Sequence, residues 1–116
     1  MKHVPSPPAL IEIFEQVIPQ GDDIQTRKMF SYPCFFINGN LTAGLHADNM
    51  IMRLSDNDRS EFLKIPDAHI FEPMPGRPMK QYVTVPQPVM KDGGLLQQWL
   101  DKSVEYVRSL PPKQKR

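Results

Sequence analysis

The sequence has 116 residues, enough for one domain built around one hydrophobic core. Apolar residues make up 40% and charged residues 23%, which excludes an intrinsically disordered chain, and the net charge of +1 provides no overall attraction to nucleic acid or membranes. No apolar stretch approaches the roughly 20 residues of a membrane span, and no signal peptide is recognisable. The single cysteine, Cys34, can form no internal disulfide, so we expect a cytoplasmic protein.

The first predicted helix begins after Ser6, whose side chain can cap it, and the prolines that follow are tolerated in a first turn. Apolar residues then recur at helical spacing up to Ile18. Pro19 and Gly21 end the helix. We expect residues 1–8 to form a loose N-terminus.

A block of strands is predicted next, separated by two turns. The Asn38-Gly39 pair favours a tight hairpin turn, because both residues tolerate the positive φ that such turns need. Asp48-Asn49 marks the second turn. The predicted strands cover residues 28–30 at the sheet edge, 34–38, 41–47 and 50–54.

Side chains along a strand alternate between two faces, so the turns decide which residues point inward. The two turns pair Phe36 with Leu41, Cys34 with Ala43, and Leu45 with Met52. One face is then wholly apolar and is expected in the core; it comprises Cys34, Phe36, Leu41, Ala43, Leu45, Ala47, Met50, Met52 and Leu54. The other face is mixed. Its apolar residues Phe35, Ile37 and Ile51 would form an interaction patch unless a helix covers them.

A second helix is predicted between its Ser55 cap and Pro66, with acidic residues in the first turn, where they suit the helix dipole. Short strands are expected at residues 70–71 and 81–85. The intervening segment, residues 71–79, contains too many prolines for a central strand or a helix.

The last predicted helix follows Gly93-Gly94 and carries an apolar stripe from Leu96 to Val107. Residues 111–116 form a basic tail. The element order is therefore α-β-β-β-β-α-β-β-α. It predicts an α+β domain with an antiparallel sheet of five to six strands and helices packed on one side.

Three segments of this sequence form an unusual combination. They are Arg27-Lys28-Met29-Phe30-Ser31-Tyr32-Pro33 with the hairpin after it, Phe71-Glu72-Pro73-Met74-Pro75-Gly76-Arg77-Pro78-Met79, and residues 99–113. From about residue 10 onward, the sequence resembles the N-terminal domain of the TfoX/Sxy family of competence regulators. Ser31 stands where that family usually has glycine.

The resemblance implies an α+β fold and, for the two-domain relatives, a part in regulating natural competence. Those relatives carry a second, C-terminal domain. Because the sequence ends at Arg116, we expect a single domain over residues 1–116 without that second unit. The family provides no established catalytic residues that map onto this sequence.

Residues for catalysis or metal binding are few. A buried Cys34 would act as a small hydrophobe and not as a nucleophile. His46 and Asp48 can share a strand face, but no third ligand stands at a predictable spacing. Glycine-rich phosphate loops and hydrolase or zinc-protease motifs are missing. We therefore predict a non-enzymatic domain with no cofactor and no metal; an enzyme would need a pocket that holds His46 or another titratable group.

The preferred hypothesis is a binding or regulatory module that contacts another protein or a second copy of itself. Proline fixes the shape of residues 71–79, which makes Arg77 either part of a rigid connector or a bidentate donor to an anion. The alternative is weak binding of nucleic acid or an anionic ligand by a basic patch around Arg77. The candidate binding residues are Arg27, Lys28, Phe35, Ile37, Ile51, Arg53, Arg77 and Lys80.

Overall fold

An antiparallel sheet of six strands organises the computed structural model, which describes residues 6–29 and 32–112. The strand order across the sheet is β1-β2-β3-β4-β6-β5. The elements are α1 (Pro8–Val17), β1 (Ile24–Met29), β2 (Tyr32–Ile37), β3 (Asn40–His46), β4 (Asn49–Arg53), α2 (Asp56–Phe62), β5 (His69–Met74), β6 (Arg77–Thr84), α3 (Gln87–Met90) and α4 (Gly93–Arg108). The α+β class and the element order are confirmed, with the one-turn helix α3 as an addition.

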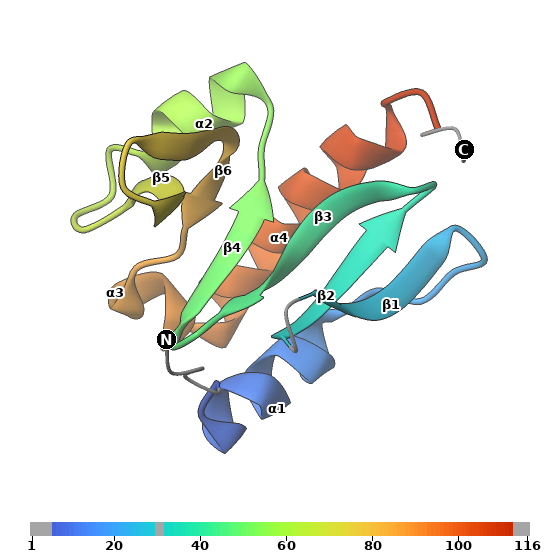
Figure 1. Ribbon diagram of the computed structural model, residues 1–116, viewed down its shortest axis with the longest axis horizontal. Helices are drawn as coiled ribbons and strands as arrows, with labels where there is room; N and C mark the ends of the chain where they lie inside the picture. The colour runs from blue at the N-terminus through green and yellow to red at the C-terminus, as the bar shows by residue number, and fades with distance from the viewer. Residues whose placement is uncertain (1–5, 30–31, 113–116) are drawn as a thin grey trace.

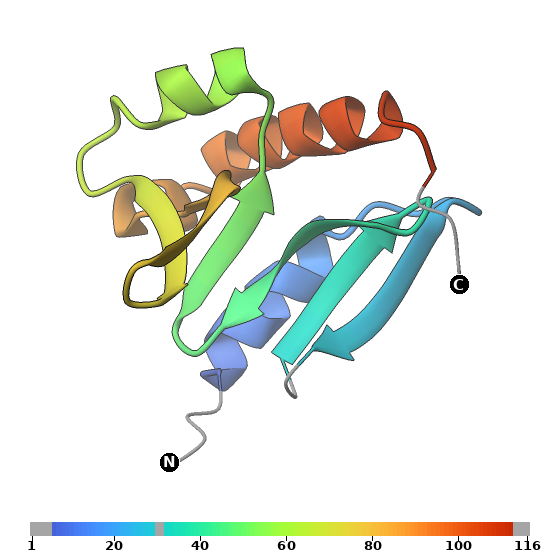
Figure 2. The same ribbon diagram turned by 45° about the horizontal axis from the view of Figure 1, so that its top comes forward.

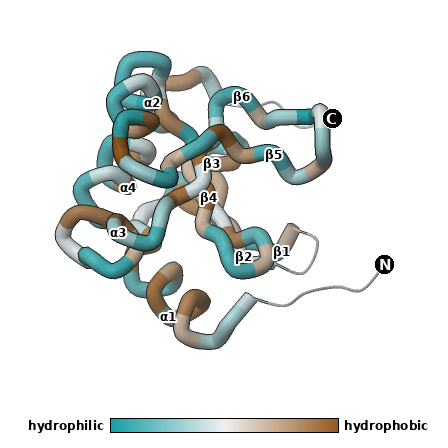
Figure 3. Tube along the Cα trace, turned by 90° about the vertical axis from the view of Figure 1, so that its left-hand side faces the viewer, coloured by the Kyte–Doolittle hydropathy of each residue, from teal (hydrophilic) through white to brown (hydrophobic). Residues whose placement is uncertain are grey.

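The helices cover one face of this sheet. In Figure 1, α4 crosses behind β3 and β4, and in Figure 2, α1 passes behind β3 and β2. Figure 3 shows α1, α2, α3 and α4 on one side of the strands. The hydrophobic segments of β3 and β4 face these helices in the centre of the view. The core forms in this layer, where Phe14 of α1, Phe62 of α2 and Leu100 of α4 are fully buried. We call the opposite, helix-free side the outer face.

Side chains cap the beginnings of α2 and α4 but not that of α1, and of these caps the one at Ser55 was predicted. Ser55 accepts a hydrogen bond from the Asp58 backbone N–H at 3.2 Å. Asp92 caps α4 by accepting from the Leu95 N–H at 3.0 Å. Ser6 does not cap α1: its hydroxyl donates to the Ala47 carbonyl at 2.6 Å, because Pro7 occupies the cap position. The predicted cap at Ser6 was therefore wrong.

Ser6 and Pro111, near the two limits of the described residues, contact the turns on either side of β3. The bond between Ser6 and Ala47 ties the beginning of the described chain to the turn after β3. At the other end, the Asn40 side-chain amide donates to the Pro111 carbonyl at 3.1 Å. Residues 1–5 of the expected loose N-terminus and residues 113–116 of the basic tail lie outside the described residues.

The predicted faces of β2 were reversed. The Asn38-Gly39 turn forms with positive φ at both residues and pairs Phe36 with Leu41, as expected. A bulge then gives β3 one additional residue, Thr42, so that Phe35 pairs with Ala43 and Cys34 with Gly44. One added residue inverts the alternation of faces.

As a consequence, Phe35 and Ile37 point into the helix layer and are fully buried. The Phe35 ring centre lies 6.0 Å from that of Phe14. The expectation that these two residues form an exposed patch was wrong. Cys34 and Phe36 lie on the outer face, so their assignment to the core face was wrong as well.

The second turn lies one residue earlier than predicted. It pairs His46 with Asn49 and Leu45 with Met50. This moves the register by two residues, which preserves which residues share a face. The predicted core positions Ala43, Leu45, Met50, Met52 and Leu54 are accordingly confirmed.

Residues 71–79 form a β-hairpin, although their prolines argued against a central strand or a helix. β5 and β6 are joined at Pro75-Gly76, where Gly76 has φ +80°. The prolines fit because β5 is an edge strand with two register irregularities, and Pro78 lies beyond the part of β6 that pairs with β4. We expected strands at residues 70–71 and 81–85, so β5 and β6 both extend further toward the turn than predicted.

Candidate functional site

Two segments that lie about 40 residues apart in the sequence meet on the outer face. Met29 and Tyr32 come from the end of β1 and the start of β2, and Phe71, Pro73 and Met79 come from the β5–β6 hairpin. They enclose a cavity of about 100 Å³ over the middle of the sheet. We call it the outer-face pocket; its lining is Met29, Tyr32, Leu45, His46, Ile51, Phe71, Pro73 and Met79.

His46 lines the outer-face pocket and packs against two aromatic rings. Its ring centre lies 5.4 Å from that of Tyr32 and 5.2 Å from that of Phe71, the second in an edge-on arrangement. Such pairs contribute about 0.5–1.5 kcal/mol each beyond their burial. Apart from the His46 imidazole and the Tyr32 hydroxyl, the lining side chains are apolar. The arrangement suits the binding of an apolar group with at most one or two hydrogen bonds.

A second cluster lies beside this pocket and is centred on Arg53. The Arg53 Cζ atom lies 5.9 Å from the ring centres of both Tyr82 and Tyr106. The Tyr82 hydroxyl donates to the Leu41 carbonyl at 2.8 Å. Burial raises the pKa of Tyr82, and the positive charge and hydrogen bond of Arg53 oppose that rise.

Arg53 also lines an open hollow of about 300 Å³ together with Met79, Lys80, Gln81 and Tyr82. We call it the Arg53 hollow. Met79 borders both this hollow and the outer-face pocket, so the two sites are neighbours.

The predicted basic residues are only partly brought together. Arg53 and Lys80 share the Arg53 hollow, whereas Arg77 lies exposed at the tip of the β5–β6 hairpin and does not line it. Arg27 and Lys28 belong to β1, which forms the opposite edge of the sheet. There Arg27 stacks on Phe36 at 5.2 Å and donates to Gln25 at 2.9 Å. The expected patch around Arg77 therefore reduces to the pair Arg53 and Lys80.

Of the predicted apolar patch, Ile51 alone contributes to the outer-face pocket, and its side chain is almost fully buried. The pocket residues outside the predicted binding residues and strand faces are Met29, Tyr32, Phe71, Pro73 and Met79. One feature of the sequence could have indicated these residues: they lie within two of the unusual segments on which the family resemblance is based. Next to them, Met74 is the most exposed large hydrophobic residue among those that the structure describes, with 59% of its surface accessible.

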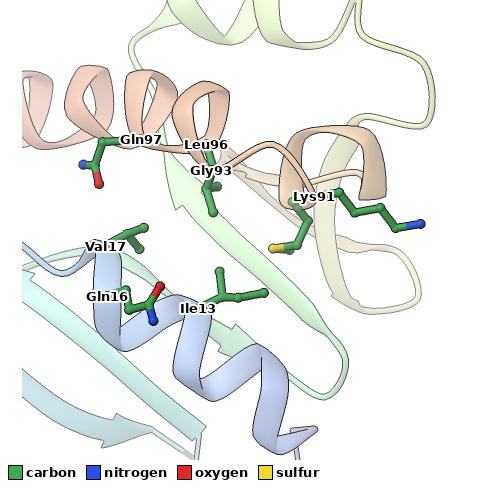
Figure 4. Close-up of a pocket in the computed structure, with 8 residues that line it drawn as sticks. Ile13, Gln16, Val17, Lys91, Gly93, Leu96 and Gln97 are labelled. Carbon is green, nitrogen blue, oxygen red and sulfur yellow. The ribbon is translucent and has the colours of Figure 1, made fainter.

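A larger groove of about 430 Å³ lies on the helical side of the molecule, between α1 and the start of α4 (Figure 4). Val17 and Leu96 supply apolar walls, and Gln16 and Gln97 supply polar ones. In Figure 4, the Lys91 side chain extends away from this groove. No charged group of the lining is therefore directed at a bound molecule.

Among the described residues, no three histidine, cysteine or acidic side chains come together as a metal site would require. Cys34 is buried beneath the outer face, and its thiol donates to the Arg27 carbonyl at 3.4 Å. Burial raises the pKa of the Cys34 thiol, and the charge of Arg27 opposes that rise. A protonated, buried thiol is a poor nucleophile.

The raised pKa values of Cys34 and Tyr82 predict a loss of stability in alkaline solution. Their ordinary values are 9.0 and 10.0, and folding raises both, so the stabilisation is complete below about pH 9 and is lost as the pH rises through the folded values. We expect the urea midpoint to be constant below about pH 9 and to fall as the pH rises above that value, through the raised pKa values of the two groups. The fall should be smaller in Cys34→Ala than in the wild type, and an equal fall in both proteins would contradict the role given to the thiol.

The fold and the two neighbouring sites define a small α+β domain that presents an apolar pocket and a cationic hollow on the open face of its sheet. The family model described as the TfoX N-terminal domain matches residues 15–107, and the chain belongs to this family. A search of curated proteins finds no significant match. Within the described part of the chain, no helix has the length and apolar character to cross a membrane.

Proposed function

We propose that the domain is a non-catalytic binding module that holds an apolar side chain of a partner protein in the outer-face pocket. The observation that carries this proposal is the convergence of Met29 and Tyr32 with Phe71, Pro73 and Met79 around one cavity. A volume of about 100 Å³ is below the ~300–1,000 Å³ of most metabolite sites. It is also below the roughly 150 Å³ of a cavity that accommodates benzene, so it corresponds to one aliphatic side chain of about the size of leucine.

The β5–β6 hairpin supports a protein partner over a free small molecule. Pro73, Pro75 and Pro78 restrict its backbone, so little conformational entropy is lost when a partner docks on it. The exposed Met74 and Arg77 extend the contact surface beyond the pocket. Methionine and arginine are both enriched at protein interfaces.

Membership of the TfoX family supports a regulatory role for this module, in transcription or competence. The single, buried cysteine is compatible with a cytoplasmic location. A second copy of this chain is one form that the partner can take. Mass determination by light scattering at two salt concentrations distinguishes a homodimer from a monomer that awaits another protein.

Met29→Glu is expected to weaken partner binding at least tenfold. The new carboxylate would lose its hydrating water when the partner's apolar side chain enters the pocket. A loss of about 1.4 kcal/mol in binding free energy is enough to weaken the affinity tenfold. Peptides selected from a displayed random library on the wild-type domain would be titrated into both proteins by calorimetry.

Thr26→Glu is the matched control, because it adds the same charge to the same strand. Thr26 is exposed and pairs with Phe35, which places it on the opposite face of β1 from Met29. Its affinity for the peptides should stay within about twofold of the wild type. Equal peptide affinity of Met29→Glu and Thr26→Glu would show that the outer-face pocket is not the binding site of the partner.

A further inference from the structure

Arg53 is a cation that is held in place without an anionic partner. Its half-buried side chain lies between Tyr82 and Tyr106, and its Nε atom is buried with no hydrogen-bond partner among the described residues. The ion pairs found in the described part of the chain are Arg59–Asp56, Lys64–Glu61 and Arg108–Asp23. None of them neutralises Arg53. Since the two rings already restrict the guanidinium, a ligand that pairs with it loses little side-chain entropy.

The Arg53 hollow offers positive charge without competing carboxylates. Its lining contains Arg53 and Lys80 as charged groups and no acidic side chain. The nearby Glu72 of β5 accepts a hydrogen bond from the Gly76 backbone N–H at 2.8 Å, which engages it within the hairpin. An oxyanion is therefore the ligand group that complements this hollow.

The hollow and the outer-face pocket can be filled by one ligand. Ile51 lines the pocket and Arg53 lines the hollow, and the two residues lie on the same face of β4, two positions apart. That spacing corresponds to about 7 Å along a strand. Met79 borders both sites. A carboxylate within about 7 Å of an apolar side chain matches this layout.

We infer that Arg53 and Lys80 bind a carboxylate next to the apolar group in the outer-face pocket, so that the partner segment presents an acidic residue beside its apolar anchor. The inference rests on the proposed function in one respect: the apolar part of the ligand is taken to occupy the outer-face pocket. Arg53 supplies the planar, bidentate donor, and Lys80 supplies a second, more mobile positive charge. Together they explain why a rigid arginine lies beside an apolar pocket in this domain.

Hexanoate is the probe that tests this inference, with hexanamide as its neutral counterpart. Both would be titrated at constant ionic strength while NMR follows the Arg53 Nε–H resonance and the methyl resonances of Met29 and Met79. Hexanoate should shift all three in a saturable manner, with a dissociation constant in roughly the millimolar range. Hexanamide should bind about tenfold more weakly, because it cannot form the charge-assisted pair.

Three variants separate a specific site from general attraction of anions. Arg53→Lys keeps the charge but loses the planar fork, and hexanoate should bind it about tenfold more weakly. Lys80→Gln should weaken hexanoate binding about two- to fivefold. Because Lys80 is exposed, this variant can be measured even if Arg53→Lys does not fold. Arg77→Gln removes an exposed charge from the same strand outside the hollow and should bind like the wild type.

The resonances distinguish failure of the inference from failure of the proposed function. If hexanoate and hexanamide bind equally and shift only the methionine methyls, the apolar pocket is supported and the carboxylate site is overturned. If hexanoate shifts only Arg53 Nε–H, the carboxylate site is supported and the pocket is overturned. Equal weakening by Lys80→Gln and Arg77→Gln would overturn the carboxylate site in favour of unspecific attraction.

Discussion

A Phe35→Asp variant is expected to lose its folded structure. Phe35 is fully buried between the sheet and α1, in contact with Phe14. Truncation of a buried phenylalanine alone costs about 3–5 kcal/mol, and an unpaired buried carboxylate adds several more. Small domains have a total stability of about 5–15 kcal/mol, so the sum can remove most of it. Circular dichroism with urea titration would show the loss, and Phe35→Ala would give a measurable free energy of unfolding.

The neighbouring Phe36→Ala variant is the matched control. Phe36 lies on the outer face, is half-buried, and contacts the Arg27 guanidinium. Its truncation should cost about 1–2 kcal/mol, because its ring buries less area and loses a surface cation–π contact. A larger loss for Phe36→Ala than for Phe35→Ala would mean that the faces of β2 are assigned the wrong way round.

Gly44→Ala is expected to destabilise the domain by about 1–3 kcal/mol, although it adds a single methyl group. A Cβ atom at position 44 would lie 2.7 Å from the Cβ of Cys34 and 3.2 Å from the Pro33 carbonyl oxygen. Neither atom is the end of a flexible side chain, so the backbones of β2 and β3 would have to separate. The change in urea midpoint at constant m-value would measure this cost.

Two comparisons identify the collision with Cys34 as the cause. Gly93→Ala has nothing within 4 Å of its new Cβ and should be neutral or slightly stabilising. In a double-mutant cycle, Cys34→Gly removes the opposing Cβ and should recover about 1 kcal/mol or more of the cost of Gly44→Ala. Cys34→Ser retains the Cβ and should recover none. Simple additivity with Cys34→Gly would show that another effect is responsible.

The sequence by itself determined the features that depend on neighbouring residues. The positive φ values that Asn38-Gly39 tolerates predicted the first hairpin, and Ser55 predicted the start of α2. Helical spacing of apolar residues identified α1 and α4. These signals depend on only a few consecutive residues, which is why they could be read without the tertiary structure. The unusual segments around Met29 and Phe71 also contained most of the pocket residues.

The tertiary structure decided which way the strands face and which residues meet. The bulge at Thr42 reversed the faces of β2, so Phe35 and Ile37 became core residues and the expected patch did not form. A bulge is a single extra residue with no strong signature, yet it inverts every side chain on one side of it.

Met29 and Met79 line one pocket, and Arg53 and Lys80 line one hollow, because of the strand order across the whole sheet. No local pattern specifies that β6 inserts between β4 and β5 and brings the hairpin over His46. The packing of the helices on one face leaves the other face free to form the outer-face pocket, and it also places Tyr106 of α4 against Arg53.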